Sequence, residues 1–193
     1  MARTKDFNEE EVLEKAVCLF WHKGYNGTSM QELVDHLGIS RSSLYDTYAD
    51  KHTLYVKALE HYQNTSGGKM CEIINESTSA RQAIRRLLEL VTVDLLNDEQ
   101  HKGCFMVNAE VEIASHDEEV KQIVRRNEEW IEDAFFRAIR KGQESGEIAN
   151  TQDARALARF IFNNVKGIRV SAKSVTDRSF FEDIIKITLS VLD

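Results

Sequence analysis

The sequence contains no proline among its 193 residues. Proline disrupts helix interiors, whereas proteins rich in sheets and loops use it in their turns. Its absence therefore favours a chain of α-helices joined by short connections. A chain of this length can also bury a sizeable core.

Long apolar runs are also missing. No segment approaches the ~20 apolar residues that cross a bilayer, and the N-terminus lacks the apolar stretch of a secretory signal. We therefore expect a cytoplasmic protein with no membrane partner. Hydrophobic and charged residues make up 42% and 30% of the chain, as in soluble globular proteins.

Cysteine is scarce. Cys18, Cys71 and Cys104 form an odd, widely spaced set that fits neither a disulfide framework nor a zinc ribbon. His101 and Cys104 have ligand-like spacing and His116 follows, but no second pair completes four ligands, so no metal is expected. Cys18 lies beside the apolar face of the first predicted helix, and we expect it in the core. The sequence leaves Cys71 undecided.

An excess of positive charge is absent as well. The net charge is −7, and the first 51 residues hold six basic and nine acidic side chains. Such a chain is not expected to coat nucleic acid through a general electrostatic field. Any affinity for DNA must come from a few well-placed side chains.

Apolar residues recur at helical spacing in about nine segments, which predicts an all-α fold. The segments cover residues 8–23, 28–37, 80–96, 103–114, 115–142, 153–174 and 178–192, with a short helix after Ser40 and a long one after Asp50. Asn8 is expected to cap the first helix, and capping boxes are expected at Thr28 with Gln31 and at Ser115 with Glu118. Residues 66–68, Ser-Gly-Gly, predict a kink or a short break.

The stretch from Thr28 to Lys51 predicts two short helices joined by a tight turn at residues 38–40. This is the layout of a helix-turn-helix, whose second helix enters the major groove of DNA. Double-stranded DNA is therefore the partner that the sequence indicates.

Residue types in this stretch suit such a contact. The helix N-terminus at Thr28 offers backbone amides to a phosphate, and Lys51 offers a point charge to another. The hydroxyls of Tyr45 and Tyr48 can bind phosphates while their rings pack on the core. Arg41 suits a guanine edge. The predicted DNA-binding residues are Thr28, Ser40, Arg41, Ser42, Ser43, Tyr45, Tyr48 and Lys51. Each alone could be an ordinary cap or a half-buried aromatic, but the spaced constellation favours DNA binding.

The spacing of these residues is similar to that in one known family. A threonine-opened helix, a glycine turn and a short helix ending Leu-Tyr-x-x-Tyr before a lysine resemble the DNA-binding domain of the TetR family of bacterial transcriptional regulators. The matching positions here are Thr28, Gly38, Ser40, Leu44, Tyr45, Tyr48 and Lys51. Residues 102–108, Lys-Gly-Cys-Phe-Met-Val-Asn, resemble a segment of one subgroup. Ser42 stands where many relatives carry glycine, so the base preference of relatives does not transfer.

The resemblance implies a two-domain arrangement. A three-helix DNA-binding domain is expected over residues 1–50, and a helical regulatory and dimerisation domain over residues 51–193. The last two helices, about 153–174 and 178–192, are expected to form a four-helix bundle with a second copy, so that the homodimer reads a palindromic operator. A monomer core is the alternative for these helices.

The resemblance also implies a ligand cavity between the middle helices, with no cofactor. The candidate lining residues are Cys104, Phe105, Asn108, Glu112, Trp130, Phe162, Asn163, Arg169 and Lys173. An apolar cleft with few polar groups is the usual small-molecule site. Plain core packing is the alternative for each aromatic residue.

Cys104 is the most specific of these candidates. It follows Gly103 at a helix start or turn, where backbone amides would stabilise a thiolate. Lys102 is its neighbour, and Lys173 could approach it if the family packing holds. Such a thiolate would react with electrophiles or be oxidised to a sulfenic acid. An inert buried cysteine is the alternative.

Together these patterns predict a homodimeric transcriptional repressor, not an enzyme, that a small molecule or an electrophile releases from its operator. Two other functions stay open from the sequence. One is a helical protein-interaction module, and the other is a thiol-dependent enzyme that uses Cys104 as its nucleophile. Activation in place of repression is also open.

Overall fold

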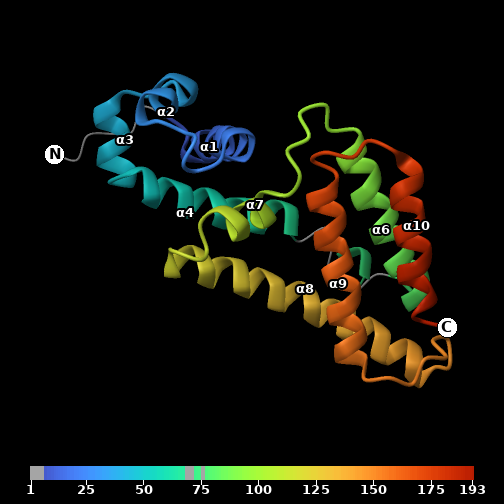
Figure 1. Ribbon diagram of the computed structural model, residues 1–193. Coiled ribbons are helices and arrows are strands. Elements are labelled where there is room, and N and C mark those ends of the chain that lie inside the picture. Colours follow the sequence, from blue (N-terminus) through green and yellow to red (C-terminus); the bar gives the residue numbers. More distant parts are fainter. Residues whose placement is uncertain (1–6, 68–71, 75–76) are drawn as a thin grey trace.

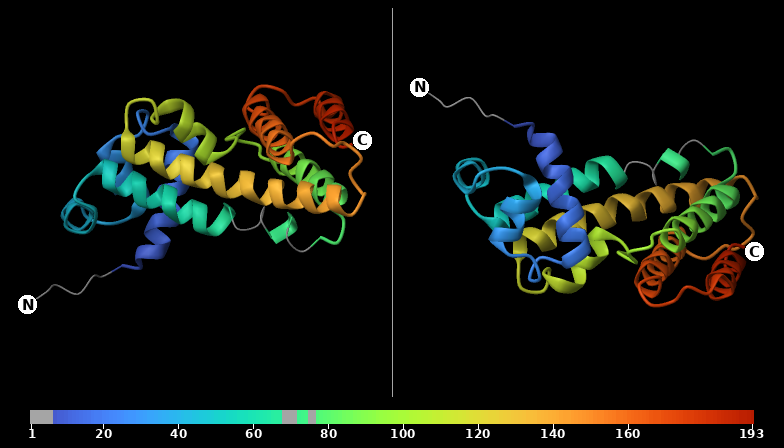
Figure 2. Two further views of the ribbon diagram at one scale, coloured as in Figure 1. Left: turned by 90° about the horizontal axis from the view of Figure 1, so that it is seen from below. Right: turned by 90° about the horizontal axis from the view of Figure 1, so that it is seen from above.

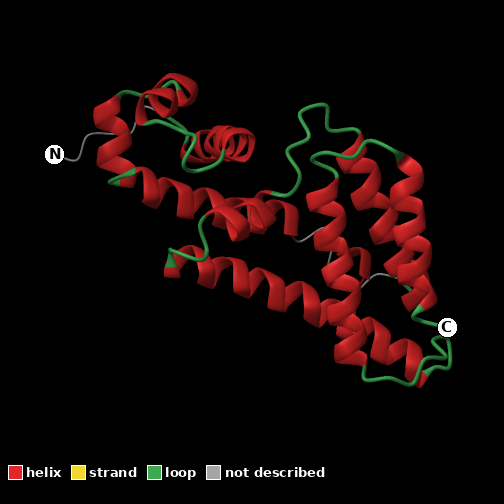
Figure 3. Ribbon diagram, viewed as in Figure 1, coloured by secondary structure: helices red, strands yellow, loops and turns green. Residues whose placement is uncertain are grey.

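The computed structural model describes residues 7–67, 72–74 and 77–193. Within these ranges all regular secondary structure is helical, and turns and loops join the helices. No strand occurs in the described ranges (Figure 3). The prediction of an all-α fold is confirmed. No helix in the described part of the chain is long and apolar enough to span a membrane. Cys71 and Gly68 lie outside the described residues.

The helices follow one another closely along the chain (Figure 1). Their bounds are α1 Glu9–Lys23, α2 Met30–Leu37, α3 Arg41–Tyr48, α4 Lys51–Tyr62, the π-helix η1 Gln63–Gly67, α6 Ala80–Leu96, α7 Phe105–Glu112, α8 Glu118–Glu144, α9 Ala154–Ser171 and α10 Arg178–Ser190. Helix α4 runs directly into η1 at Gln63. The kink or break expected at residues 66–68 stays a prediction, because it extends beyond the described residues.

Two hydrophobic cores hold these helices together. The first core contains buried residues of α1, α2, α3, α4 and α7 and of the first turns of α8. Along the sequence, these residues extend from Val12 to Val124. The second joins α6, α9 and α10 with the rest of α8. The long helix α8 therefore runs past both cores, as Figures 1 and 2 show. A domain boundary at residue 50 stays a prediction, since α4 and α7 pack with the N-terminal helices.

Local capping explains where the first helices begin. Asn8 caps α1 as predicted, accepting a hydrogen bond from the Glu10 backbone nitrogen at 3.0 Å. The predicted capping box at Thr28 is wrong by one residue. Ser29 and Glu32 form the box of α2, because the Thr28 hydroxyl instead donates to the Gly24 carbonyl at 2.7 Å.

The start of α8 also differs from the prediction. Asp117, and not Ser115, is its N-cap, and the Asp117 carboxylate accepts a hydrogen bond from the Val120 backbone nitrogen at 3.1 Å. Cys18 is exposed, which corrects its expected place in the core. The buried face of α1 consists of Val12, Ala16, Val17 and Phe20. Position 18 lies about 100° further round the helix than position 17 and so faces solvent.

Candidate functional site

The helix α3 begins with a cluster of hydroxyl groups. Ser40 caps the helix by accepting a hydrogen bond from the Ser43 backbone nitrogen at 3.0 Å. Its Oγ also lies 2.9 Å from Ser42 Oγ and 2.8 Å from Ser43 Oγ. The three serines therefore present one connected set of donors and acceptors at the N-terminal end of α3.

One face of α3 is exposed and the opposite face is buried. Leu44 and Tyr48 pack in the first core, whereas Arg41, Ser42 and Tyr45 face solvent. The Arg41 guanidinium lies 5.9 Å from the centroid of the Tyr45 ring. A cation over an aromatic face is attracted to it, so these two side chains form one surface unit.

Tyr48 does not share this surface. Its ring is only 1% exposed, as the predicted packing on the core requires. Its buried hydroxyl has no hydrogen-bond partner among the described residues. Burial and the nearby Glu9 carboxylate raise the pKa of Tyr48 to about 12. The predicted contact of the Tyr48 hydroxyl with a phosphate is therefore wrong, because the hydroxyl is inside.

Thr28 and Lys51 were predicted to bind phosphates. The structure places them together, and the Lys51 side chain binds the Thr28 backbone. The Lys51 ammonium donates to the Thr28 carbonyl at 2.7 Å and lies 4.3 Å from the Tyr25 ring centroid. Burial lowers the pKa of Lys51, against the opposing effect of the Glu112 carboxylate. The exposed group at the start of α2 is Ser29, which sequence reasoning missed. The pattern of Ser29 followed three residues later by Glu32 was the available signal.

Cys104 lies at a cavity of about 350 Å³ between the two cores. Its walls come from α1, α4, α6, α9, the loop before α7 and Ile73 in the segment before α6. They include Trp21, Tyr62, Leu87, Asp94, Lys102 and Arg169. A volume of this size suits a small organic molecule. Sequence reasoning identified Cys104 and Arg169, but it missed the aromatic residues of α1 and α4 and the whole wall from α6.

The Cys104 sulfur has polar partners although its side chain is buried. Arg169 Nη1 donates to Sγ at 3.0 Å, and the Tyr62 hydroxyl lies 3.8 Å from Sγ. The sulfur therefore lies between a cationic side chain and a hydroxyl group. Burial and the Cys104 thiol raise the pKa of Tyr62, which keeps this hydroxyl protonated at neutral pH.

The other residues predicted to line a cavity divide into three groups. Phe105 and Phe162 are buried, Phe105 in a ring cluster with Trp21, Tyr55 and Tyr62. Asn108, Glu112 and Lys173 line a separate surface hollow of about 420 Å³. Trp130 and Asn163 are exposed and border neither the Cys104 cavity nor the surface hollow, so their place at a ligand site stays a prediction. Helical spacing alone did not separate the inner from the outer face at these two positions.

Lys173 approaches the Cys104 segment without contacting the sulfur. Its ammonium donates to Asn108 Oδ1 at 3.0 Å, and Asn108 Nδ2 donates to the Lys102 carbonyl at 2.9 Å. These bonds tie the end of α9 to the start of α7. No group of three or more metal-ligating side chains gathers anywhere in the described ranges.

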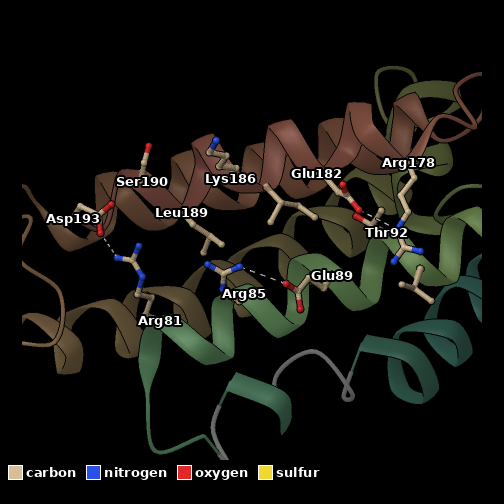
Figure 4. A pocket seen from close by; sticks show the side chains of 12 residues that line it. Arg81, Arg85, Glu89, Thr92, Arg178, Glu182, Lys186, Leu189, Ser190 and Asp193 are labelled. Atoms are coloured by element: carbon tan, nitrogen blue, oxygen red, sulfur yellow. Dashed lines mark hydrogen bonds and ion pairs between the residues drawn. The ribbon is translucent and has the colours of Figure 1, made fainter.

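A further groove of about 600 Å³ lies between α6 and α10 (Figure 4). Its charged rim is paired internally. Arg81 binds Asp193, Arg85 lies 3.6 Å from Glu89, and Arg178 lies 3.2 Å from Glu182. The three arginines that line the groove are therefore each paired with a carboxylate.

Two family models match the chain. The model of bacterial regulatory proteins of the tetR family matches residues 12–58, and that of the tetracyclin repressor-like C-terminal domain matches residues 79–187. The first match contains α2 and α3 with their serine caps. The second contains α6 to α9 and most of α10, including Cys104.

Known proteins resemble the whole chain. The HTH-type transcriptional regulator YezE of Bacillus subtilis strain 168 is 34% identical over 194 residues, covering 100% of both chains. The HTH-type transcriptional repressor ComR of Escherichia coli K12 is 25% identical, covering 89% of this chain and 82% of its own. A cysteine mutant of the TetR family regulator CifR, solved in complex with 26-bp operator DNA, has a TM-score of 0.87. It is 26% identical and covers 99% of this chain and 100% of its own.

These relatives are transcriptional regulators and not enzymes, so the thiol-dependent enzyme is set aside. The prediction of the family from the Thr28–Lys51 segment is confirmed. The chain belongs to the TetR family of bacterial transcriptional regulators.

Proposed function

We propose that this protein is a homodimeric repressor that binds a palindromic operator through α3 and is released when Cys104 reacts with an electrophile or an oxidant. The observation that carries the proposal is the Arg169 guanidinium 3.0 Å from Cys104 Sγ at the wall of a 350 Å³ cavity. A cysteine sulfur with a cationic partner beside a ligand-sized cavity is a candidate site for a covalent inducer.

DNA reading is assigned to the exposed N-terminal end of α3. Arg41 and Ser42 would reach base edges, and Ser40, Ser43 and Tyr45 would bind the backbone or nearby bases. The Ser29 cap and the backbone amides at the start of α2 suit a phosphate better than the buried Thr28 side chain does. Lys51 supports this surface by fixing the start of α2. The CifR complex with operator DNA supports the same use of the fold.

Dimer formation is assigned to α9 and α10. Both helices bury one face in the second core, through residues such as Leu157, Ile161 and Phe181. Large apolar side chains remain exposed on the same two helices, namely Phe160, Val170, Phe180 and Ile187. Exposed apolar groups on adjacent helices mark an interaction surface. A second copy would cover them and set the spacing of two α3 helices on DNA.

Two reactions at Cys104 fit the cavity. The thiolate can add to the β-carbon of an α,β-unsaturated carbonyl, where a C–S bond forms and the enolate takes a proton from water. Hydrogen peroxide can instead give a sulfenic acid, as an S–O bond forms, the O–O bond breaks and hydroxide leaves. Either product enlarges a side chain that is only 3% exposed. Because interiors are close-packed, neighbouring elements must move to accommodate it.

The experiment begins with the operator. Purified protein is used to select fragments from sheared genomic DNA at near-physiological salt, and the recovered site is tested for palindromic symmetry. Recovery of one palindrome is expected. Recovery of no specific fragment would contradict the DNA-binding part of the proposal and would favour a protein-interaction module.

The second step treats the operator complex with hydrogen peroxide or with acrolein. Wild type is expected to release the DNA, and the Cys104→Ser variant is expected to stay bound. Cys18→Ser is the matched control, because Cys18 is exposed and should react without effect on binding. Release of the Cys104→Ser variant to the same extent as wild type would contradict the assignment of Cys104.

A further inference from the structure

We propose that Glu112 is the positioning residue that couples the state of Cys104 to the DNA-reading helices. This inference rests on the proposed function, because it concerns how a change at Cys104 reaches α2 and α3. Helix α7 carries both groups. Cys104 is its N-cap and Glu112 is its last residue.

Glu112 holds the loop between α1 and α2. Its carboxylate accepts hydrogen bonds from the backbone nitrogens of Tyr25 at 3.0 Å and Asn26 at 2.8 Å, more than 80 positions earlier in the chain. Bonds from backbone N–H groups to an ionised carboxylate are among the stronger ones in proteins. Glu112 therefore fixes the loop from outside the DNA-reading helices.

Gly24 leaves room for the Glu112 carboxylate. Its φ is +80°, and a Cβ at this position would lie 2.8 Å from Glu112 Oε2 and 3.0 Å from Oε1. A larger residue would meet both a strained backbone and the carboxylate. The close approach of Gly24 to Glu112 indicates that the loop and the carboxylate are tightly packed against each other.

The held loop is the junction on which α2 and α4 depend. The Thr28 hydroxyl donates to the Gly24 carbonyl, and the Thr28 carbonyl accepts from Lys51 at the start of α4. Tyr25 packs against the Lys51 ammonium. A displacement of Glu112 therefore shifts the loop, the start of α2 and the start of α4 together. Helix α3 lies between α2 and α4 in the chain, so its orientation changes with them.

The opposite end of α7 responds to Cys104. The start of this helix is fastened to α9 by the bonds of Arg169 to Cys104 and of Lys173 to Asn108. An adduct on Sγ would break the first bond and push the helix start. A helix of eight residues is only about two turns long, and its backbone hydrogen bonds make it move as a unit. Movement at Cys104 thus reaches Glu112.

Glu112 lies away from the Cys104 cavity, although the sequence predicted it as a ligand-binding residue. It lines the surface hollow of about 420 Å³ together with Gly24 and Lys173. The hydrogen bonds that the Glu112 carboxylate accepts from the loop backbone give it a role in coupling that does not require contact with the inducer.

The test measures operator affinity before and after alkylation of Cys104 with iodoacetamide, in the full-length protein. Wild type is expected to lose affinity by roughly tenfold or more on alkylation. The ratio of operator affinity before alkylation to that after it is expected to be roughly fivefold or more smaller in Glu112→Gln than in wild type. The reason is that the amide group cannot accept hydrogen bonds from both backbone nitrogens. Glu144→Gln is the matched control. Glu144 is an exposed carboxylate that pairs with Arg140 at 3.0 Å within α8, so its ratio of affinities should stay that of wild type.

The outcomes separate the two proposals. A large wild-type ratio that Glu112→Gln retains would overturn the coupling role alone. A wild-type ratio of one would overturn the proposed function, and the coupling role with it. A merely structural role would lower the melting temperature of Glu112→Gln without changing the ratio, which also overturns the inference.

A second measurement needs no variant. Hydrogen exchange at the Tyr25 and Asn26 amides in wild type is expected to accelerate by roughly tenfold on alkylation of Cys104. The Gly38 amide, which donates to the Val34 carbonyl at 3.1 Å within the same group of helices, should be unchanged. Equal exchange at Tyr25 and Asn26 before and after alkylation would contradict the coupling.

Discussion

Arg169 and Cys104 are 65 positions apart in the sequence, yet Arg169 Nη1 donates a hydrogen bond to Cys104 Sγ at 3.0 Å. The bond joins α9 to the N-cap of α7 at the wall of the cavity. In the proposed function, the same sulfur is both a structural tie and the nucleophile. Chemistry at Cys104 is therefore inseparable from the packing of two helices.

The first prediction concerns this bond. In Arg169→Leu, alkylation of Cys104 by iodoacetamide at neutral pH is expected to slow by about tenfold, because a hydrogen bond from a charged donor contributes about 1.5–3 kcal/mol. Mass spectrometry of the Cys104 peptide gives the rate. Arg159→Leu, on the exposed face of the same helix, should react at the wild-type rate. Equal rates in all three proteins would contradict the stabilisation of the thiolate by Arg169.

The second prediction separates the two tyrosines of α3. Tyr45→Phe is expected to weaken operator binding by roughly fivefold, through loss of one exposed hydroxyl contact. Tyr48→Phe should leave operator affinity unchanged. Tyr48→Phe should lower the free energy of unfolding by less than about 1 kcal/mol, or raise it, because the buried hydroxyl lacks a partner among the described residues. Binding titrations and urea unfolding of both variants measure these effects. A loss of affinity only in Tyr48→Phe would reverse the assignment.

The third prediction concerns pH. Burial alone would raise the pKa of Asp117, but the Val120 backbone N–H and His52, whose Nε2 is 2.6 Å from the carboxylate, hold it below its ordinary value. A pKa that folding lowers stabilises the protein above the ordinary pKa of the group, and this contribution is lost as the pH falls through the folded-state pKa. Asp117→Asn keeps the helix cap but removes the charge. Urea unfolding should therefore find wild type more stable than Asp117→Asn at about pH 6.

That difference should shrink below about pH 4, the ordinary pKa of aspartate. Glu99→Gln, at an exposed position in the loop after α6, is the control for a general effect of charge. A difference that stays constant from pH 6 to pH 3 would contradict the role of the Asp117 charge.

The fourth prediction tests the dimer surface. Ile187 is 64% exposed on α10, and Ile187→Glu is expected to weaken self-association by roughly tenfold or more. Sedimentation equilibrium measures the effect. Val111 is 75% exposed on α7, outside the proposed surface, and Val111→Glu should leave association unchanged. Dissociation of both variants, or of neither, would contradict the assignment to α9 and α10.

Much of the fold could be predicted from the sequence, because helix periodicity and caps are local. Asn8, Gly38 and Ser40 define helix ends through bonds within a few residues. The errors at Thr28 and Ser115 arose where a second polar residue competed for the cap. Thr28 is drawn away by the Gly24 carbonyl, a contact that the spacing of residues does not reveal.

The site was less predictable, because its walls come from six parts of the chain. Cys104 and Arg169 were found as separate candidates, but their contact depends on how α7 meets α9. Trp21 and Asp94 belong to helices that the sequence did not connect to Cys104. Trp21 borders the cavity whereas Trp130 is exposed, a difference that depends on tertiary packing.

The most direct test follows modification and DNA release in one sample. Operator-bound wild-type protein is titrated with iodoacetamide, and the fraction of DNA released is compared with the fraction of Cys104 alkylated, measured by mass spectrometry. The account predicts that the two fractions rise together while alkylation of Cys18 has no influence. Full alkylation of Cys104 with the operator still bound would contradict it.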